Sequence, residues 1–198
     1  MNHLKSFVAL AGVGLMAVLG AGTASAETTA CKATTEPCTS AWPVGTKFVA
    51  HLESGTHTTI TPTGIFPEDV TCKKSTIEGK IETATTPTGK LSKFTHEECV
   101  GGVITVTKPG TFTIHHDSEH NGRLTLAGGE YHIEQNGVPC TFGGTITDGL
   151  TLTAGNPARI DVTAETPGLS GFPCPPSIVI HATYIVTEPA PLYITTGV

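Results

Sequence analysis

Charged and aromatic residues are scarce in this sequence. Charged side chains make up 14% of it and aromatic ones 6%, and Trp42 is the only tryptophan. So few aromatic rings do not identify a stacking platform for carbohydrate. Acidic residues (17) outnumber basic ones (11), which gives a formal net charge of -6. Because an acidic protein repels phosphate groups, this charge argues against nucleic acid and anionic lipid as partners.

The motifs of common hydrolases are also missing. No Gly-x-Ser-x-Gly elbow occurs, and Ser170 in Leu169-Ser170-Gly171 lacks the first glycine of that motif. The carboxylate pairs Glu68-Asp69 and Glu97-Glu98 consist of adjacent residues, which point in opposite directions on a strand. Neither pair can therefore flank a sugar as two facing acids. A pair of acids assembled from distant strands remains the alternative.

One cluster of possible metal ligands requires attention. It surrounds a single loop and consists of His115, His116, Asp117, Glu119 and His120, with His132 farther along the chain. Neither a His-Glu-x-x-His motif nor an EF-hand loop is present. Because polar residues collect at solvated hairpin tips, we predict such a tip and neither a metal nor a cofactor.

All six cysteines lie beyond residue 26: Cys31, Cys38, Cys72, Cys99, Cys140 and Cys174. No pair has Cys-x-x-Cys spacing, which disfavours zinc and thioredoxin-like chemistry. An even number in an exported chain indicates disulfides, although spacing alone cannot choose among 15 pairings. We predict sequential pairing, because each bridge would then close a loop around its own group of strands.

The first 26 residues are typical of a cleaved signal peptide. Lys5 supplies the positive charge, residues 8–20 form an uncharged apolar run, and Ala24-Ser25-Ala26 resembles a cleavage site. No second run reaches membrane length, so we expect a secreted, extracellular chain without a membrane span. We expect residues 27–45 to form an irregular N-terminal arm and residues 46–198 a single all-β domain.

The remaining sequence has the period of β-strands. Threonine accounts for 34 of the residues after position 26, and Val, Ile and Leu recur at every second position. The clearest strands cover residues 47–53, 70–82, 158–162 and 177–187. With no amphipathic helical run, the pattern predicts about eleven short strands in an antiparallel β-sandwich or flattened β-barrel, stapled by disulfides.

Residues 103–135 form the most regular part of this pattern and predict a β-meander. We place a hairpin turn at Gly128-Gly129, which sets Leu126 opposite Tyr131 and Arg123 opposite Glu134. Residues 117–121 should form a longer loop, because a tight Asn121-Gly122 turn would put acids opposite leucines.

Two further dipeptides predict turns. A loop at Lys108-Pro109-Gly110 would pair residues 103–107 with 111–116, and Asp148-Gly149 would join residues 145–147 to 150–153 in a hairpin.

Several motifs resemble a group of small secreted actinobacterial proteins of unknown function. They are Cys72-x4-Ile77-x-Gly79, Cys99, Cys140-Thr141-Phe142 before Gly144-Thr145-Ile146-Thr147, and Cys174-Pro175 before Tyr184-x-Val186-Thr187-x-Pro189. The resemblance covers residues 45–196 and leaves out Cys31 and Cys38. It implies export and a β-rich domain stapled by cysteines, and it brings no established activity.

The sequence thus favours a non-catalytic extracellular binding or structural module, whose partner would be an unknown ligand, a wall polymer or a protein. The alternative is an extracellular hydrolase with a site assembled across strands. A pocket lined by convergent polar groups would distinguish the two.

Overall fold

A computed structural model describes residues 27–64 and 68–197 of the chain. Within them the fold is all-β and antiparallel, as predicted, with no helix that could cross a membrane. The predicted signal peptide, residues 1–26, lies outside the described residues. The strands are β1 (Thr28–Cys31), β2 (Lys47–Leu52), β3 (Thr58–Pro62), β4 (Val70–Ile81), β5 (Thr88–Val100), β6 (Val103–Lys108), β7 (Thr111–His116), β8 (Gly122–Gln135), β9 (Val138–Ile146), β10 (Leu150–Thr153), β11 (Ala158–Pro167), β12 (Ser177–Glu188) and β13 (Tyr193–Thr196).

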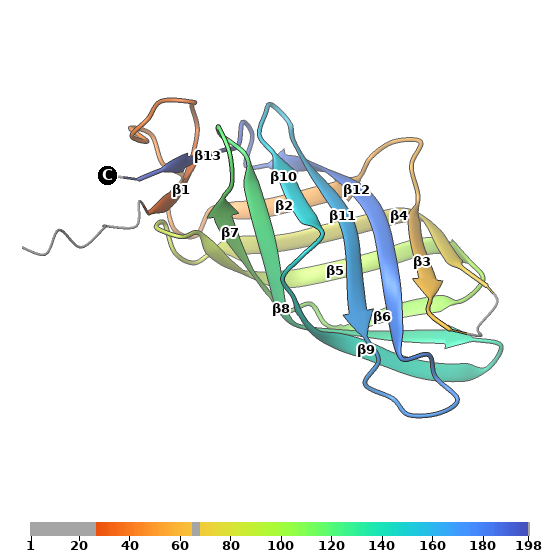
Figure 1. The fold of residues 1–198 in the computed structure, drawn as a ribbon. Coiled ribbons are helices and arrows are strands. Elements are labelled where there is room, and N and C mark those ends of the chain that lie inside the picture. Colours follow the sequence, from red (N-terminus) through yellow and green to blue (C-terminus); the bar gives the residue numbers. More distant parts are fainter. Residues whose placement is uncertain (1–26, 65–67, 198) are drawn as a thin grey trace, which may run out of the picture.

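The large sheet closes on itself at one end, which we call the closed end (Figure 1). There the ladders run from β10 through β11, β12, β2, β4, β5 and β7 to β8. β8 then returns to β10, with Arg123 paired to Thr151 and Gly122 to Leu152. Of the two predicted architectures, the flattened barrel is therefore the one found at this end.

A second, two-stranded sheet covers the closed end. β1 pairs with β13, and Ala30, Cys31 and Ile194 are almost completely buried there. The Trp42 ring nitrogen donates a hydrogen bond to the Pro191 carbonyl at 3.0 Å, which fastens the loop between β1 and β2. A strand thus occupies residues 28–31, in the segment where the sequence indicated only an irregular arm.

At the opposite end, the open end, the wall is interrupted twice. Among the described strands, no ladder joins β5 to β6, and β9 meets the end of β11 only through an isolated bridge between Phe142 and Gly168. The wall is therefore a barrel that is closed by ladders at one end and interrupted at the other.

Disulfides reinforce this arrangement. The six cysteines pair in sequence order, as Cys31–Cys38, Cys72–Cys99 and Cys140–Cys174, which is the pairing we predicted. Cys72–Cys99 joins β4 to β5, and Cys140–Cys174 joins β9 to the loop after β11. The last bridge spans an interruption of the wall, where backbone hydrogen bonds are few.

The predicted hairpin at Gly128-Gly129 is wrong. β8 passes through both glycines as one strand of 14 residues. Gly128 has φ +68°, and the pairing with β9 shifts register between Leu126 and Gly129, which identifies a β-bulge. A glycine pair provides positive φ equally well in a turn or in a bulge. The alternation of apolar residues flanks a turn and a bulge in the same way, so the local sequence does not distinguish the two.

The turns predicted at Lys108-Pro109-Gly110 and Asp148-Gly149 are wrong for the same reason: both are bends within a long strand. β6 and β7 do not pair with each other but follow one another along β8, on either side of Pro109-Gly110. β9 and β10 likewise both pair with β8, and Asp148-Gly149 lies between them. The true meander has three long bent strands, connected by the predicted loop at residues 117–121 and by a tight turn at Asn136-Gly137.

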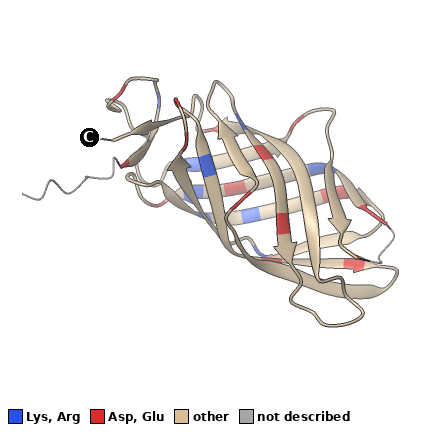
Figure 2. Cartoon of the chain, viewed as in Figure 1, with Lys and Arg blue, Asp and Glu red and all other residues tan. Residues whose placement is uncertain are grey.

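Inside the barrel, two apolar clusters are separated along its long axis. The closed-end cluster includes Phe48, Phe112 and Ile194, whereas the open-end cluster includes Ile60, Ile133 and Phe142. The outer surface carries the charges, with Lys on β2 and both Lys and Glu on β4 and β5 (Figure 2).

Candidate functional site

A cavity of about 110 Å³ lies at the open end; we call it the mouth cavity. Its wall is mainly apolar and comes from β3, β4, β8, β9 and β12. The lining residues are Ile60, Pro62, Glu68, Val70, Ile133, Gln135, Asn136, Val138, Cys140, Phe142, Pro175 and Ile178. Period-two alternation directs the strand side chains inward, so the sequence pattern itself produces an apolar lining.

Exposed apolar side chains surround this cavity. Of the large hydrophobic residues that the described chain exposes, Val44 alone lies away from the open end. The others are Val100 at the end of β5, Val103 at the start of β6, Val138 at the start of β9, and Leu169 and Phe172 in the loop after β11. Phe172 is 96% exposed. Of these residues, Val138 also lines the mouth cavity. Single exposed apolar side chains are common on protein surfaces, so what distinguishes these five is that they share one end of the molecule.

The loop that presents Leu169 and Phe172 is fastened at several points. The Leu169 backbone N–H donates to the Thr141 carbonyl at 2.8 Å, and the Ser170 hydroxyl accepts from the Thr141 N–H at 2.9 Å. The Cys140–Cys174 bridge holds the far side of the loop. These hydrogen bonds and this bridge fasten the loop to β9.

Gln135 fastens the opposite side of the mouth. Its side-chain amide donates to the carbonyls of Glu68, at 3.0 Å, and Gly101, at 3.2 Å. The cavity has few polar groups at its edge and apolar walls below them. Such a site can hold a small uncharged hydrophobic group and provides no hydrogen-bond network for a polar one.

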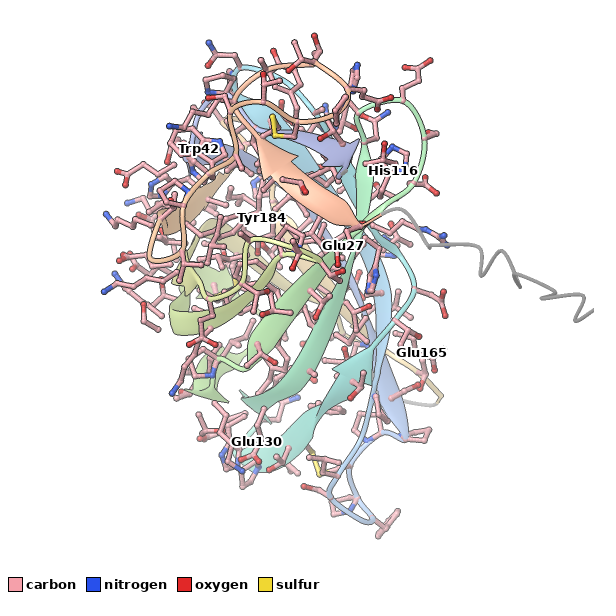
Figure 3. The ribbon with its side chains drawn as sticks, turned by 90° about the vertical axis from the view of Figure 1, so that its left-hand side faces the viewer. Glu27, Trp42, His116, Glu130, Glu165 and Tyr184 are labelled. Carbon is pink, nitrogen blue, oxygen red and sulfur yellow. A yellow bond between two sulfur atoms is a disulfide. The ribbon has the colours of Figure 1, made fainter. Side chains whose placement is uncertain are left out.

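A polar layer lies deeper, between the two apolar clusters. The Tyr184 hydroxyl hydrogen-bonds the Ser75 hydroxyl at 2.9 Å, and Ser75 donates to the Thr95 carbonyl at 2.8 Å. Tyr184 lies inside the ring of strands when the molecule is viewed from the β1 side, whereas Glu130 and Glu165 lie at the periphery (Figure 3). Burial raises the pKa of the hydroxyls of both Tyr131 and Tyr184, so both are neutral donors.

His96 belongs to this layer. It pairs across the sheet with Ser75, and its ring lies 4.8 Å from that of Phe94. Both ring nitrogens are covered and have no hydrogen-bond partner among the described residues. Burial lowers the pKa of the imidazole to about 4. His96 is therefore neutral at physiological pH. No motif in the sequence marks it as a buried histidine.

The histidines considered as metal ligands belong to two different parts of the sheet. His115 pairs with Arg123 in one half of β8, whereas His132 pairs with Thr105 and Thr141 in the other half. The predicted pairing of Arg123 with Glu134 is wrong, because it depended on the Gly128-Gly129 hairpin. Within residues 27–64 and 68–197, no group of three potential metal ligands comes together.

The residues considered for hydrolysis also serve other contacts. Ser170 accepts a backbone hydrogen bond, and Glu98 forms an ion pair with Lys74. In the described part of the chain no serine hydroxyl hydrogen-bonds a histidine; the histidine hydrogen bonds to side chains go to Thr76, Thr141 and Thr163 on the outer face. No reactive pair is assembled at the mouth cavity.

Sequence reasoning missed the mouth cavity altogether. Two signals could have indicated it: the Asn136-Gly137 dipeptide, which is a strong hairpin signal, and the apolar Leu169 and Phe172 in a segment otherwise read as a loop. Searches against protein-family models, curated proteins and solved structures found no match, so the resemblance to secreted actinobacterial proteins stays a prediction.

Proposed function

We propose that the protein is a secreted, non-catalytic binding module that takes a small hydrophobic group into the mouth cavity. The observation that carries this proposal is the apolar cavity of about 110 Å³, surrounded by exposed apolar side chains on fastened loops. Secretion follows from the sequence of residues 1–26 and agrees with three disulfides.

The cavity limits the size of the ligand. A dry engineered cavity of about 150 Å³ binds benzene. The mouth cavity, at about 110 Å³, is smaller but opens to the surface, so it suits a group no larger than a single ring or a short branched alkyl chain. A larger molecule would insert such a group and rest its remaining surface on Val138, Leu169 and Phe172. A hydrolase would need a reactive pair at the same place. The polar residues that line the cavity are Glu68, Gln135 and Asn136, and among the described residues neither a second carboxylate nor a serine–histidine pair joins them.

Benzene tests the proposal, observed through the backbone amide NMR signals of the cavity lining. Saturable shifts are expected at Ile133, Phe142 and Ile178, with a Kd on the order of 1 mM for a ligand of six heavy atoms. Val138→Trp should abolish them, because Val138 both lines the cavity and is 36% exposed at its rim.

Val44→Trp is the matched control, since Val44 is exposed and does not line the cavity. This variant should bind benzene as the wild type does. Absence of shifts in the wild type, or unchanged shifts in Val138→Trp, would refute a hydrophobic site at the mouth.

A further inference from the structure

Three lysines stand side by side on the outer face, one on each of three neighbouring strands. Lys47 on β2 pairs directly with Lys80 on β4, and Lys80 pairs directly with Lys90 on β5. All three are exposed. Side chains directly opposite one another in a sheet are close neighbours, and like charges at such positions are destabilising. We call these three residues the lysine row. Repulsion between their charges lowers the stability of the sheet.

The carboxylates around the lysine row do not neutralise it evenly. Lys47 reaches Glu188 at 3.7 Å. Glu78, two residues before Lys80 on the same face of β4, pairs with Lys93 at 3.4 Å, and the exposed Glu82 lies just beyond the end of β4. Lys80 and Lys90 have no ion pair among the described residues. Two adjacent cations are thus available to a ligand, on a protein whose net charge of -6 repels anions elsewhere.

A groove continues the row. It has a volume of about 490 Å³ and runs between Lys90 and Lys108, with Thr107, Thr111, Ala127 and Gly128 along it. Lys108 is held by Glu130, and the hydrogen bond from Lys108 lowers the pKa of that carboxyl group. The groove leaves room for the remainder of a ligand whose anionic groups lie on the lysine row.

We propose that the lysine row and this groove bind an extended ligand that carries two or three anionic groups about 5 Å apart, which is the spacing of neighbouring strands. Phosphate and carboxylate groups both meet this description. The site is independent of the mouth cavity, which lies at the open end and is apolar.

Calorimetric titration at low ionic strength tests the proposal with two probes, tripolyphosphate and trigalacturonate. At least one should bind ten times more tightly than its monomer, orthophosphate or galacturonate, and binding should weaken as salt is added. Binding of only one probe identifies the anionic group as phosphate or carboxylate.

The double variant Lys80→Gln/Lys90→Gln should lose at least tenfold in affinity. Lys80→Arg/Lys90→Arg should keep most of it, which separates charge from fold. Lys32→Gln/Lys73→Gln changes the net charge equally at other places and should lose less than threefold. Equal losses in the two glutamine variants, or no preference for the oligomeric probes over the monomers, would overturn the proposal.

Discussion

The two ends of this barrel achieve stability by different means. At the closed end every neighbouring pair of strands forms a ladder, and the β1–β13 sheet covers the opening. At the open end the wall is interrupted between β5 and β6 and nearly so between β9 and β11, and two of the three disulfides lie there. Of these two, only Cys140–Cys174 spans an interruption, because Cys72–Cys99 joins β4 and β5, which already share a ladder. A covalent bond thus stands in for hydrogen bonds at the β9–β11 interruption.

The difference explains where a ligand could enter. Side chains fill most of the interior at the closed end and leave a cavity of only about 40 Å³, whereas the mouth cavity at the interrupted end measures about 110 Å³. The missing ladder hydrogen bonds lower the local stability of this end, and the Cys140–Cys174 bridge compensates for part of that loss. The contrast between the two ends makes the following predictions possible.

Removing the disulfide across the interruption should have the largest effect. Cys140→Ala/Cys174→Ala opens a loop of 34 residues and should lower the free energy of unfolding by about 4 kcal/mol by the loop-entropy relation. Cys31→Ala/Cys38→Ala, at the closed end, opens only 7 residues and should cost about 2 kcal/mol. Urea denaturation measures both, and an equal or reversed order would show that the bridge is not specially needed at the open end.

Acidification should destabilise the polar layer between the ends. Burial holds the pKa of His96 at about 4, below its usual value of 6.5, so the unfolded chain binds the proton more readily. The stability that depends on neutral His96 is complete above pH 6.5 and falls between pH 6.5 and 4, by about 3 kcal/mol in total.

His96→Leu should remove most of this decrease, because it replaces the imidazole by an apolar group of similar size. His181→Gln, on the exposed outer face, is the control for the loss of a histidine and should leave the decrease in place. Denaturation measured at several pH values decides the matter; a decrease that survives in His96→Leu would assign it to other groups.

Substitutions at two glycines distinguish a bend within the wall, at Gly149, from a true hairpin turn, at Gly137. At Gly149, φ is +79° and an added Cβ would lie 1.8 Å from the Thr163 carbonyl oxygen, so Gly149→Ala should cost about 3 kcal/mol. At Gly137, φ is +78° but no atom lies within 4 Å, so Gly137→Ala should cost only about 1 kcal/mol. Similar losses in thermal denaturation would mean that Gly149 is not packed against β11.

The strands were predictable from sequence because their burial pattern is local. Residues 177–187 alternate with period two, and the structure has β12 there. The partners of the strands were not predictable in the same way. Gly128 and Gly149 have the conformation of a turn residue, and only the long-range closure of the barrel makes them bends.

The mouth cavity was beyond sequence reasoning for a related reason. Its lining comes from strands far apart in the chain, such as β3 and β9, which do not pair with each other. Ile60 and Phe142 look like ordinary core residues in the sequence. Only the interruption of the wall turns the space between them into a candidate site.

Native-state hydrogen exchange, resolved by residue, tests the contrast between the two ends most directly. We expect slow exchange for the amides that join β7 to β8 and β10 to β11 at the closed end. The amides of β5 and β6 that take no part in their ladders with β4 and β8 should exchange much faster. Equally slow exchange along β5 and β6 would show that the wall closes there as well, and would contradict an open end.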